Sequence, residues 1–220
     1  TIKMKIGYGP EIDVRIVRQV REALKPETAL AVDANCAYDA GTAAMLGRML
    51  EPFGLAWWEE PILAEDYTGY ARLRQAFSIP LASGESMTTD DIAEHYVAPR
   101  LIDIVQPDIE SVGFTGGRRL TWLTWLQHQR LIPHNWGTAV RTASELHWTS
   151  TIPVPTDALF QRQSMFEFDR TEHPFRDAVI AQKIDIEEGG LITVPDAPGL
   201  GVDVIPDAVA QFTTEHLVVK

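Results

Sequence analysis

Seven short strand-like segments, each with an ionisable residue near its C-terminal end, constrain the fold of this chain more than any other feature. The residues at their ends are Lys5, Asp33, Glu59, Glu85, Asp108, His134 and Glu167. Most of the gaps between them are about 26 residues long, a plausible length for one β-strand and the helix that follows it. Runs rich in Ile, Val and Leu that stop at a polar residue are typical of buried parallel strands. The pattern therefore predicts repeated β/α units.

The predicted elements alternate along the chain. Strands are expected at residues 2–6, 30–33, 56–61, 80–85, 102–108, 131–135 and 164–168. Helices are expected at about 13–24, from 39 or 41 to 50, at 66–77, from a capping hydroxyl at Thr89, at 118–129 and at 139–151. Glycines 113, 116 and 117 are expected to form a loop before the helix at 118–129.

Two architectures suit repeated β/α units. A TIM-type barrel brings the C-terminal ends of all its strands to one active-site face, whereas a doubly wound sheet brings together only the residues near its switch point. Seven polar strand ends favour the (β/α)7β barrel. Seven strands are one short of closure, so the first barrel strand is expected upstream of Thr1. We expect residues 1–183 to form the partial barrel, and residues 184–220, which read as loops and short extended pieces, to pack back on it.

Composition excludes several other classes of protein. The 220 residues are 45% hydrophobic and 23% charged, as in a globular domain, and no apolar run is long enough to span a bilayer. No signal peptide precedes the first predicted strand. Cys36 is the single cysteine, which excludes an internal disulfide and a thiolate metal cluster and favours a cytoplasmic setting. A net charge of −12 argues against a nucleic-acid partner.

Three carboxylates at successive strand ends suggest a metal site. In a barrel, Asp33, Glu59 and Glu85 would converge and offer oxygen ligands to Mg²⁺. Glu59 is preferred to Glu60 because neighbouring residues of a strand face opposite ways. Asn35 would point the same way as Asp33. The alternative is that each carboxylate only caps a loop.

Candidate acid/base groups flank this predicted metal site. Lys3 and Lys5 lie on one face of the first strand, and two ammonium groups close together disfavour each other's charge, which makes either lysine a better base. Asp108 and His134 end two later strands, and a carboxylate can orient a neighbouring histidine for proton transfer. Glu167 could hydrogen-bond a developing oxyanion if protonated. The alternative is an ordinary set of solvated side chains.

This combination suits removal of the proton beside a carboxylate. Such a proton is barely acidic, so the enediolate needs stabilisation by a metal that acts as a Lewis acid. A lysine or histidine base with Mg²⁺ is the pattern of enolase-type sites.

The sequence resembles the mandelate racemase subgroup of the enolase superfamily over nearly its whole length. The matching segments are Lys3-Met4-Lys5, Val32-Asp33-Ala34-Asn35, Trp58-Glu59-Glu60-Pro61, Ser83-Gly84-Glu85-Ser86, Gln106-Pro107-Asp108, Pro133-His134-Asn135-Trp136-Gly137, Met165-Phe166-Glu167-Phe168 and Pro198-Gly199-Leu200-Gly201. The resemblance implies an N-terminal α+β capping domain, which together with the first barrel strand is missing from this chain.

The resemblance also implies roles for the site residues. Asp33, Glu59 and Glu85 would bind Mg²⁺, and Lys5, tuned by Lys3, would act as one acid/base group. Asp108 and His134 would form a dyad on the opposite face, and Glu167 would be the hydrogen-bonding acid. Asn35 and Trp136 are further candidates for substrate contacts.

Family members with both the lysine and the histidine resemble acid-sugar dehydratases. We therefore expect Mg²⁺-dependent dehydration of a sugar acid to a 2-keto-3-deoxy acid, by a homo-oligomer that has a small carboxylate as its substrate and no nucleic-acid or membrane partner. One alternative is a racemase or epimerase of a 2-hydroxy acid, because two opposed bases permit removal and return of one proton. A non-catalytic barrel that only binds the metal is the alternative of another class.

Overall fold

The computed structural model describes residues 1–154 and 164–215. The chain divides into two compact units, Thr1–Leu131 and Ile132–Lys220, and each is described by itself. The predicted boundary between residues 183 and 184 stays a prediction. Within the described part of the chain, no helix combines the length and the apolar composition needed to cross a membrane.

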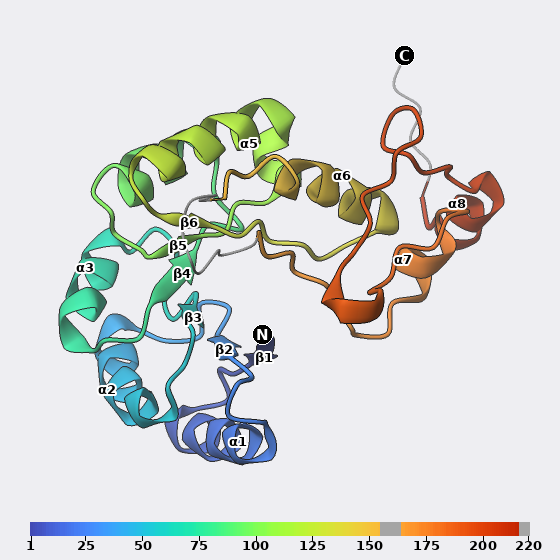
Figure 1. The fold of residues 1–220 in the computed structure, drawn as a ribbon. Helices are drawn as coiled ribbons and strands as arrows, with labels where there is room; N and C mark the ends of the chain where they lie inside the picture. Colours follow the sequence, from blue (N-terminus) through green and yellow to red (C-terminus); the bar gives the residue numbers. More distant parts are fainter. Residues whose placement is uncertain (155–163, 216–220) are drawn as a thin grey trace. The chain divides into compact units, whose positions relative to one another are not determined.

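The first unit contains a six-stranded parallel sheet (Figure 1). Its strands are β1 (Ile2–Lys5), β2 (Leu30–Asp33), β3 (Trp58–Glu59), β4 (Leu81–Ser83), β5 (Ile104–Val105) and β6 (Arg130–Leu131). Every strand pairs in parallel with the next one along the chain, in the order β1-β2-β3-β4-β5-β6. This order has no switch point, so the barrel prediction is favoured over the doubly wound sheet.

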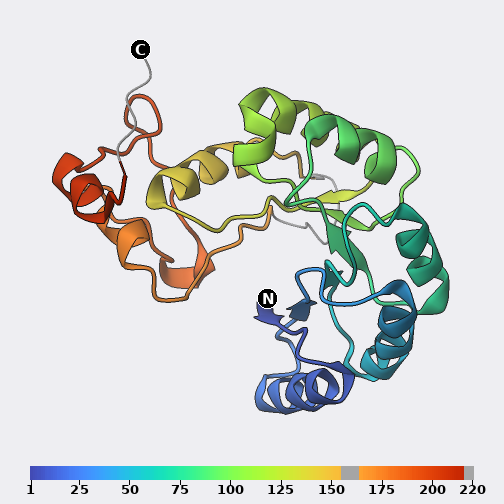
Figure 2. The ribbon, with the colours of Figure 1, turned by 180° about the vertical axis from the view of Figure 1, so that it is seen from behind.

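Helices connect the strands of the first unit. They are α1 (Pro10–Ala23), α2 (Ala40–Leu50), the 3₁₀ helix η1 (Glu51–Phe53), α3 (Tyr67–Ala76), α4 (Thr89–Asp91), the π-helix η2 (Ile92–Val97) and α5 (Ile109–Leu126). Helices α1, α2 and α3 follow one another along the outer side of the sheet in both views (Figures 1 and 2). The strands are therefore covered on that side. All four residues of β2 are buried, which explains its continuous apolar run before Asp33.

Two predicted details of the first unit were wrong. Gly116 and Gly117 do not form a loop but lie inside α5, which begins at Ile109; Gly113 alone departs from helical geometry within α5, with a φ of 62° and a ψ of 173°, and marks a kink between two helical pieces. The side chain of Asp108 caps this helix and thereby allows the early start. Thr88, rather than Thr89, caps α4, since its hydroxyl accepts a bond from the Asp91 N–H.

The second unit contains short helices and little sheet. Its helices are α6 (Ala139–Thr149), α7 (Pro174–Ala178), the 3₁₀ helix η3 (Glu188–Gly190) and α8 (Pro206–Phe212). Ala139, Val179 and Ile180 form one small buried apolar cluster in this unit, and Ile180 makes an isolated antiparallel bridge with Val204. The tail after Ile184 thus contains a helix, α8, that the loop-like sequence did not predict.

The predicted strand at residues 164–168 was also wrong. The described residues of this segment form no strand. The carbonyl of Glu167 accepts a hydrogen bond from the side-chain amide of Asn135, so a side chain satisfies a backbone group that a strand neighbour would otherwise bind.

Candidate active site

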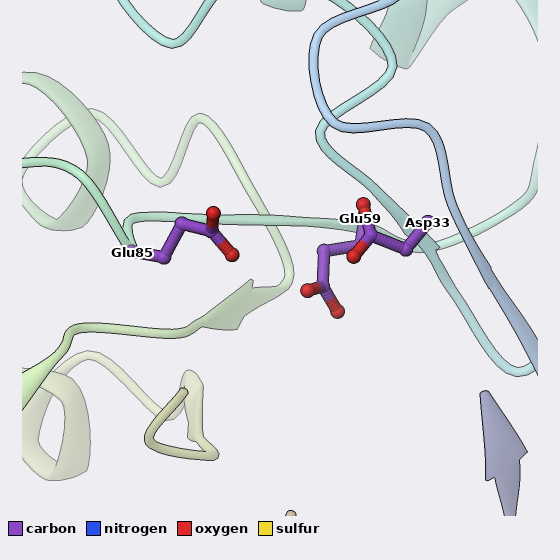
Figure 3. A group of neighbouring side chains, drawn as sticks. All are labelled: Asp33, Glu59 and Glu85. Atoms are coloured by element: carbon purple, nitrogen blue, oxygen red, sulfur yellow. The ribbon is translucent and has the colours of Figure 1, made fainter. Parts of the chain in front are cut away.

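Three carboxylates converge at the C-terminal ends of β2, β3 and β4 (Figure 3). One oxygen from each of Asp33, Glu59 and Glu85 lies within 4.8 Å of the others. The strand register explains part of this geometry, because Lys5 pairs with Asp33 and Asp33 pairs with Glu59. Residues paired across neighbouring parallel strands point to the same side of the sheet.

Glu85 reaches the group by a different route. Glu59 is paired with Ala82, so regular alternation would send Ala82 and residue 84 to the side of Glu59, and Glu85 to the other side. Gly84 has a φ of 127°, which only glycine adopts easily, and this backbone conformation breaks the alternation. Glu85 consequently turns toward the other two carboxylates.

Two lysines from β1 neutralise most of this charge. The Lys3 ammonium donates to Glu59 at 2.5 Å and lies 3.7 Å from Asp33. The Lys5 ammonium donates to Asp33 at 2.5 Å. The Lys3 side chain is 16% exposed and the Lys5 side chain is 55% exposed, so the two lysines share a face but differ in their access to solvent.

These contacts determine the ionisation of Asp33. Burial raises the pKa of this carboxyl, but the charges of Lys3 and Lys5 and the hydrogen bonds from Lys5 and the Asn35 backbone oppose burial, and the net pKa lies below its ordinary value. Asp33 is therefore a carboxylate at neutral pH. With Glu59 and Glu85 ionised, three carboxylates against two ammonium groups leave one net negative charge.

Gln106 and Trp57 bind Glu59, although neither was predicted to be part of the site. The Gln106 amide donates to Glu59 Oε2 at 2.7 Å, and the Trp57 indole N–H donates to the same oxygen at 3.2 Å. Both contacts are buried. Alternation along β3 could have indicated Trp57, which stands two residues before Glu59 on the same face. Gln106 comes from the segment after β5, and no local signal pairs it with Glu59.

Glu60 faces a different environment from Glu59. It is buried, and its carboxylate accepts a bond from the Cys36 thiol at 3.4 Å. Burial, followed by the charge of Glu85, raises the pKa of Glu60 to about 7. Burial and the neighbouring charge of Glu60 raise the pKa of Cys36 to about 12, so this thiol is protonated and unreactive at neutral pH.

Asn35 contacts Lys5 directly. Its side-chain oxygen accepts a bond from the Lys5 ammonium at 2.7 Å, and its backbone N–H donates to Asp33 at 2.9 Å. Its φ of 42° places it in the left-handed region, which asparagine tolerates better than most residues. Asn35 thus joins the lysine to the carboxylate at the end of β2.

A buried carboxylate connects the loops after β1 and β2. Asp13 in α1 accepts hydrogen bonds from the backbone N–H groups of Gly7 and Tyr8 and from the Tyr38 hydroxyl. The Tyr38 oxygen also accepts a bond from the Gly9 N–H at 3.2 Å. Burial and the bond to Asp13 raise the pKa of Tyr38 to about 12. The backbone that follows Lys5 is therefore held in place by Asp13.

The carboxylate group has the chemistry of a site for a hard divalent cation. Its donors are three carboxylate oxygens within 4.8 Å of one another, and its lysines leave it with a net negative charge. Mg²⁺ is usually held by carboxylates and keeps positions for water or substrate, so these residues fit such an ion.

Asp108 lies after β5 in the first unit. It is buried, and its carboxylate accepts a bond from the Glu110 N–H at 2.8 Å as the cap of α5. His134 belongs to the second unit, so the predicted pairing of Asp108 with His134 stays a prediction.

In the second unit, His134 Nδ1 lies 3.1 Å from Nη2 of Arg141. The Glu167 carboxylate accepts a bond from the Asn135 N–H at 3.1 Å, so Glu167 lies beside the segment that contains His134. Trp136 is 56% exposed. A cavity of about 490 Å³ in this unit is lined by Asn135 and Trp136 and by residues after Glu167.

Comparison with known proteins identifies the family. A family model described as enolase C-terminal domain-like matches residues 1–208. D-galactarolactone cycloisomerase from Agrobacterium fabrum is 36% identical over 211 residues, which cover 96% of this chain and 56% of that protein. Arabinonate dehydratase from Saccharolobus solfataricus is 30% identical over 205 residues, which cover 91% and 52% respectively.

A solved structure adds a third reaction type. A racemase from Streptomyces coelicolor A3(2), crystallised with bound magnesium, has a TM-score of 0.79 and 28% identity, and the match covers 96% of this chain and 54% of the racemase. The chain thus spans about half the length of the relatives it matches. It contains the TIM-type barrel portion of these enzymes and belongs to the enolase C-terminal domain-like family, in the mandelate racemase-like subgroup of the enolase superfamily.

Proposed function

We propose that the protein removes the proton α to the carboxylate of a sugar acid, in a Mg²⁺-dependent reaction, and then eliminates water to give a 2-keto-3-deoxy acid. The convergence of Asp33, Glu59 and Glu85 beside two lysines of one strand carries this proposal. Bound there, Mg²⁺ would act as a Lewis acid and stabilise the negative charge that develops on the substrate carboxylate.

The charge of the site supports an anionic substrate. The three carboxylates and two ammonium groups have one net negative charge, and a divalent cation would change this to one net positive charge. A substrate carboxylate would then make the site neutral, which limits the cost of burying charge.

Lys3 and Lys5 differ in their exposure to solvent, and we assign them different roles for this reason. Lys5 has an accessible side chain and is assigned as the group that exchanges a proton with substrate, whereas the largely buried Lys3 holds Glu59 and Asp33. Asn35 and Asp33 orient the Lys5 ammonium. His134, with Asp108 as its predicted partner, is the second acid/base candidate. Glu167 is the candidate acid that hydrogen-bonds the developing oxyanion, and Trp136 is a candidate for substrate contacts.

Cycloisomerisation is a second candidate reaction, favoured by the 36% identity to D-galactarolactone cycloisomerase. The two reactions share α-proton removal and differ in the leaving group. A β-hydroxyl leaves as water, whereas a ring oxygen remains attached to the product, which is then an isomer of the substrate. Racemisation, the third possibility, returns the proton to the same carbon, and a non-catalytic barrel performs none of these steps.

The test uses the complete polypeptide that contains this chain, with Mg²⁺ or with EDTA, and a panel of sugar acids and their lactones. A 2-keto acid that has lost one water by mass spectrometry is the expected product. A 2-keto product of unchanged mass would indicate cycloisomerisation instead. Exchange of the α-proton in D₂O without either product would indicate racemisation, and no exchange with any substrate would contradict the proposal.

Lys5→Ala should abolish both exchange and product formation, because it removes the proposed base. Lys25→Met, a change of an exposed lysine far along the chain from this strand end, is the control and should leave both unchanged. Equal activity of Lys5→Ala and the control would remove Lys5 from the mechanism.

A further inference from the structure

The hydroxyl of Tyr96 joins the two segments that follow Glu59 and precede Glu85. It donates a hydrogen bond to the carbonyl of Ala64 at 2.7 Å, and its oxygen lies 3.2 Å from Oγ of Ser83. A tyrosine hydroxyl has one proton and the Ala64 carbonyl can only accept, so the Ser83 hydroxyl is the donor in the second bond. Ser83 ends β4 two residues before Glu85, and Ala64 follows Glu59 by five residues. One hydroxyl therefore connects the chain segments of two proposed metal ligands.

The bonds of this hydroxyl are closed to solvent. Tyr96 has an exposed fraction of 0%, and Ser83 is 1% exposed. Burial raises the pKa of Tyr96, so its hydroxyl keeps the proton that binds the Ala64 carbonyl at neutral pH. A buried polar group that loses its partner is destabilising, which favours retention of both bonds in the folded protein.

The ring of Tyr96 is fixed by its helix and by its neighbours. Tyr96 belongs to the π-helix η2, in which the N–H of Ala98 reaches back five residues to the carbonyl of Ala93. Such helices are rare and frequently occur at functional sites. The ring packs edge-on against Tyr70 and Tyr67, with centroid distances of 5.5 and 6.0 Å. The hydroxyl is thus presented to the ends of β3 and β4 from a packed position.

The bond from Ser83 to Tyr96 is important because a conformationally free residue comes next. Gly84 has a φ of 127°, and its backbone conformation turns Glu85 toward the other two carboxylates. Glycine has more accessible backbone conformations than any other residue, so it does not fix this direction by itself. The main chain of Ser83 accepts a bond from the Gln106 N–H at 2.8 Å, and its side chain binds Tyr96. Ser83 is therefore a fixed point from which Gly84 directs Glu85.

We propose that Tyr96 is a positioning residue of the metal site, whose hydroxyl fixes Ser83 and Ala64 and thereby keeps Glu85 directed toward the ion. Tyr96 acts through Ser83 and not as a ligand. Replacement of a group that orients a metal-binding side chain typically weakens metal binding by about 10- to 100-fold. This inference rests on the proposed function, of which Mg²⁺ binding is a part.

Tyr96→Phe tests the proposal, because it removes the hydroxyl and keeps the ring. Titration calorimetry of the complete polypeptide with MgCl₂ should show a Kd raised by about 10-fold. Thr124→Val is the matched control, since the Thr124 hydroxyl is also buried but binds the carbonyl of Leu120 in its own helix, α5. The control should leave the Kd unchanged. An unchanged Kd in folded Tyr96→Phe, or an equal rise in the control, would overturn the proposal.

Ser83→Ala tests whether the effect passes through the proposed bond. It removes the hydroxyl that donates to Tyr96, so it should also raise the Kd for Mg²⁺. The double variant of Ser83→Ala and Tyr96→Phe should bind Mg²⁺ as weakly as Tyr96→Phe alone, because both changes remove the same bond. Losses that multiply in the double variant would show that the two residues act independently, and would overturn the proposal. If Tyr96→Phe is misfolded by circular dichroism, Ser83→Ala against the Thr124→Val control decides the result.

Hydrogen exchange provides a second measurement that requires neither substrate nor metal. The Met87 N–H donates to the Gly84 carbonyl at 3.3 Å, and the Gln106 N–H donates to the Ser83 carbonyl at 2.8 Å. In EDTA, exchange of the peptides that contain these amides should be faster in Tyr96→Phe than in Thr124→Val, and equal exchange would contradict the role of Tyr96. Absence of Mg²⁺ binding by the unmodified protein would contradict the proposed function and this inference together. Binding that Tyr96→Phe leaves unchanged would contradict this inference alone.

Discussion

Replacement of Lys3 by methionine tests whether the first strand provides the charge that allows the carboxylate group to be buried. Lys3 is 2.5 Å from Glu59 and 3.7 Å from Asp33, and these carboxylates are at most 1% exposed. Methionine keeps most of the volume and removes the cation, so the net charge of the group changes from one negative to two negatives. Removal of one partner of a buried ion pair costs about 3–5 kcal/mol. Because Lys3 is itself partly exposed, we expect a loss near the lower limit, about 3 kcal/mol in EDTA.

Magnesium should reduce this loss. A cation bound to the three carboxylates supplies the charge that Lys3 provided, and it binds more strongly when a neighbouring ammonium is absent. For the unmodified protein, Mg²⁺ at a hundred times its Kd stabilises the fold by about 2.7 kcal/mol. At the same Mg²⁺ concentration the variant should gain more unfolding free energy than the unmodified protein, so the difference in stability between the two should shrink by about 1 kcal/mol or more. This change is smaller than the roughly 4 kcal/mol by which two like unit charges 4 Å apart repel each other near a protein surface.

Urea denaturation of the complete polypeptide in EDTA and in Mg²⁺ measures both quantities. Lys25→Met is the matched control, since an exposed lysine should change the free energy of unfolding by less than about 0.5 kcal/mol in either condition. An equal deficit with and without Mg²⁺ would refute the coupling between Lys3 and the metal. No deficit in EDTA would refute the role of Lys3 in burying the carboxylates.

Three further predictions concern the same unit. Because the pKa of Glu60 is raised from 4.5 to about 7, the folded state retains a proton that the unfolded state loses, so stability in EDTA should decline by up to about 3 kcal/mol as pH rises from 4.5 to 7. Glu60→Gln should remove this decline in urea denaturation across that range, and parallel pH curves for the two proteins would contradict it. Gln106→Met should cost about 2 kcal/mol by the same assay, because a buried charged acceptor on Glu59 loses its donor; a change under about 0.5 kcal/mol would count against that contact. Gly47→Ala should lower the Tm despite its better helix propensity, since a Cβ would lie 2.1 Å from the Phe77 ring and overpacking costs about 1–3 kcal/mol. Scanning calorimetry should show that Phe77→Leu in the same chain restores part of the loss, and additive effects of the two changes would refute the overpacking account.

The directions of the side chains at the strand ends were predictable because side-chain direction in a parallel sheet follows from alternation and register. Alternation along each strand and in-register pairing were sufficient to place Lys5, Asp33 and Glu59 on one side, and the structure has this arrangement. The convergence of Glu85 was also predicted, but strand alternation alone does not explain it. Alternation would point the Glu85 side chain away from Glu59, and the backbone conformation of Gly84 reverses that direction.

Contacts between residues far apart in the chain could not be predicted from sequence patterns. Gln106 binds Glu59 across 47 residues, and nothing in either segment specifies the other. Gly116 and Gly117 suggested a loop because glycine disfavours helices, yet the rest of α5 outweighs that cost, whereas Gly113 does leave helical geometry. The segment at 164–168 has the composition of a strand, but composition does not specify a pairing partner. The side-chain amide of Asn135, rather than a neighbouring strand, binds the Glu167 carbonyl.

The hydrogen bonds of Asp13 have a consequence for how the loop after β1 can vary in sequence. They hold the main chain of Gly7 and Tyr8 and leave the side chain of Tyr8 outward, 65% exposed. A substitution at Tyr8 therefore changes a side chain whose backbone Asp13 already holds in place, three residues after the proposed base Lys5. Saturation libraries at Tyr8 should consequently retain folded members at high frequency, whereas libraries at Asp13 should not. Side chains at this loop can thus change while the proposed base, Lys5, keeps its place.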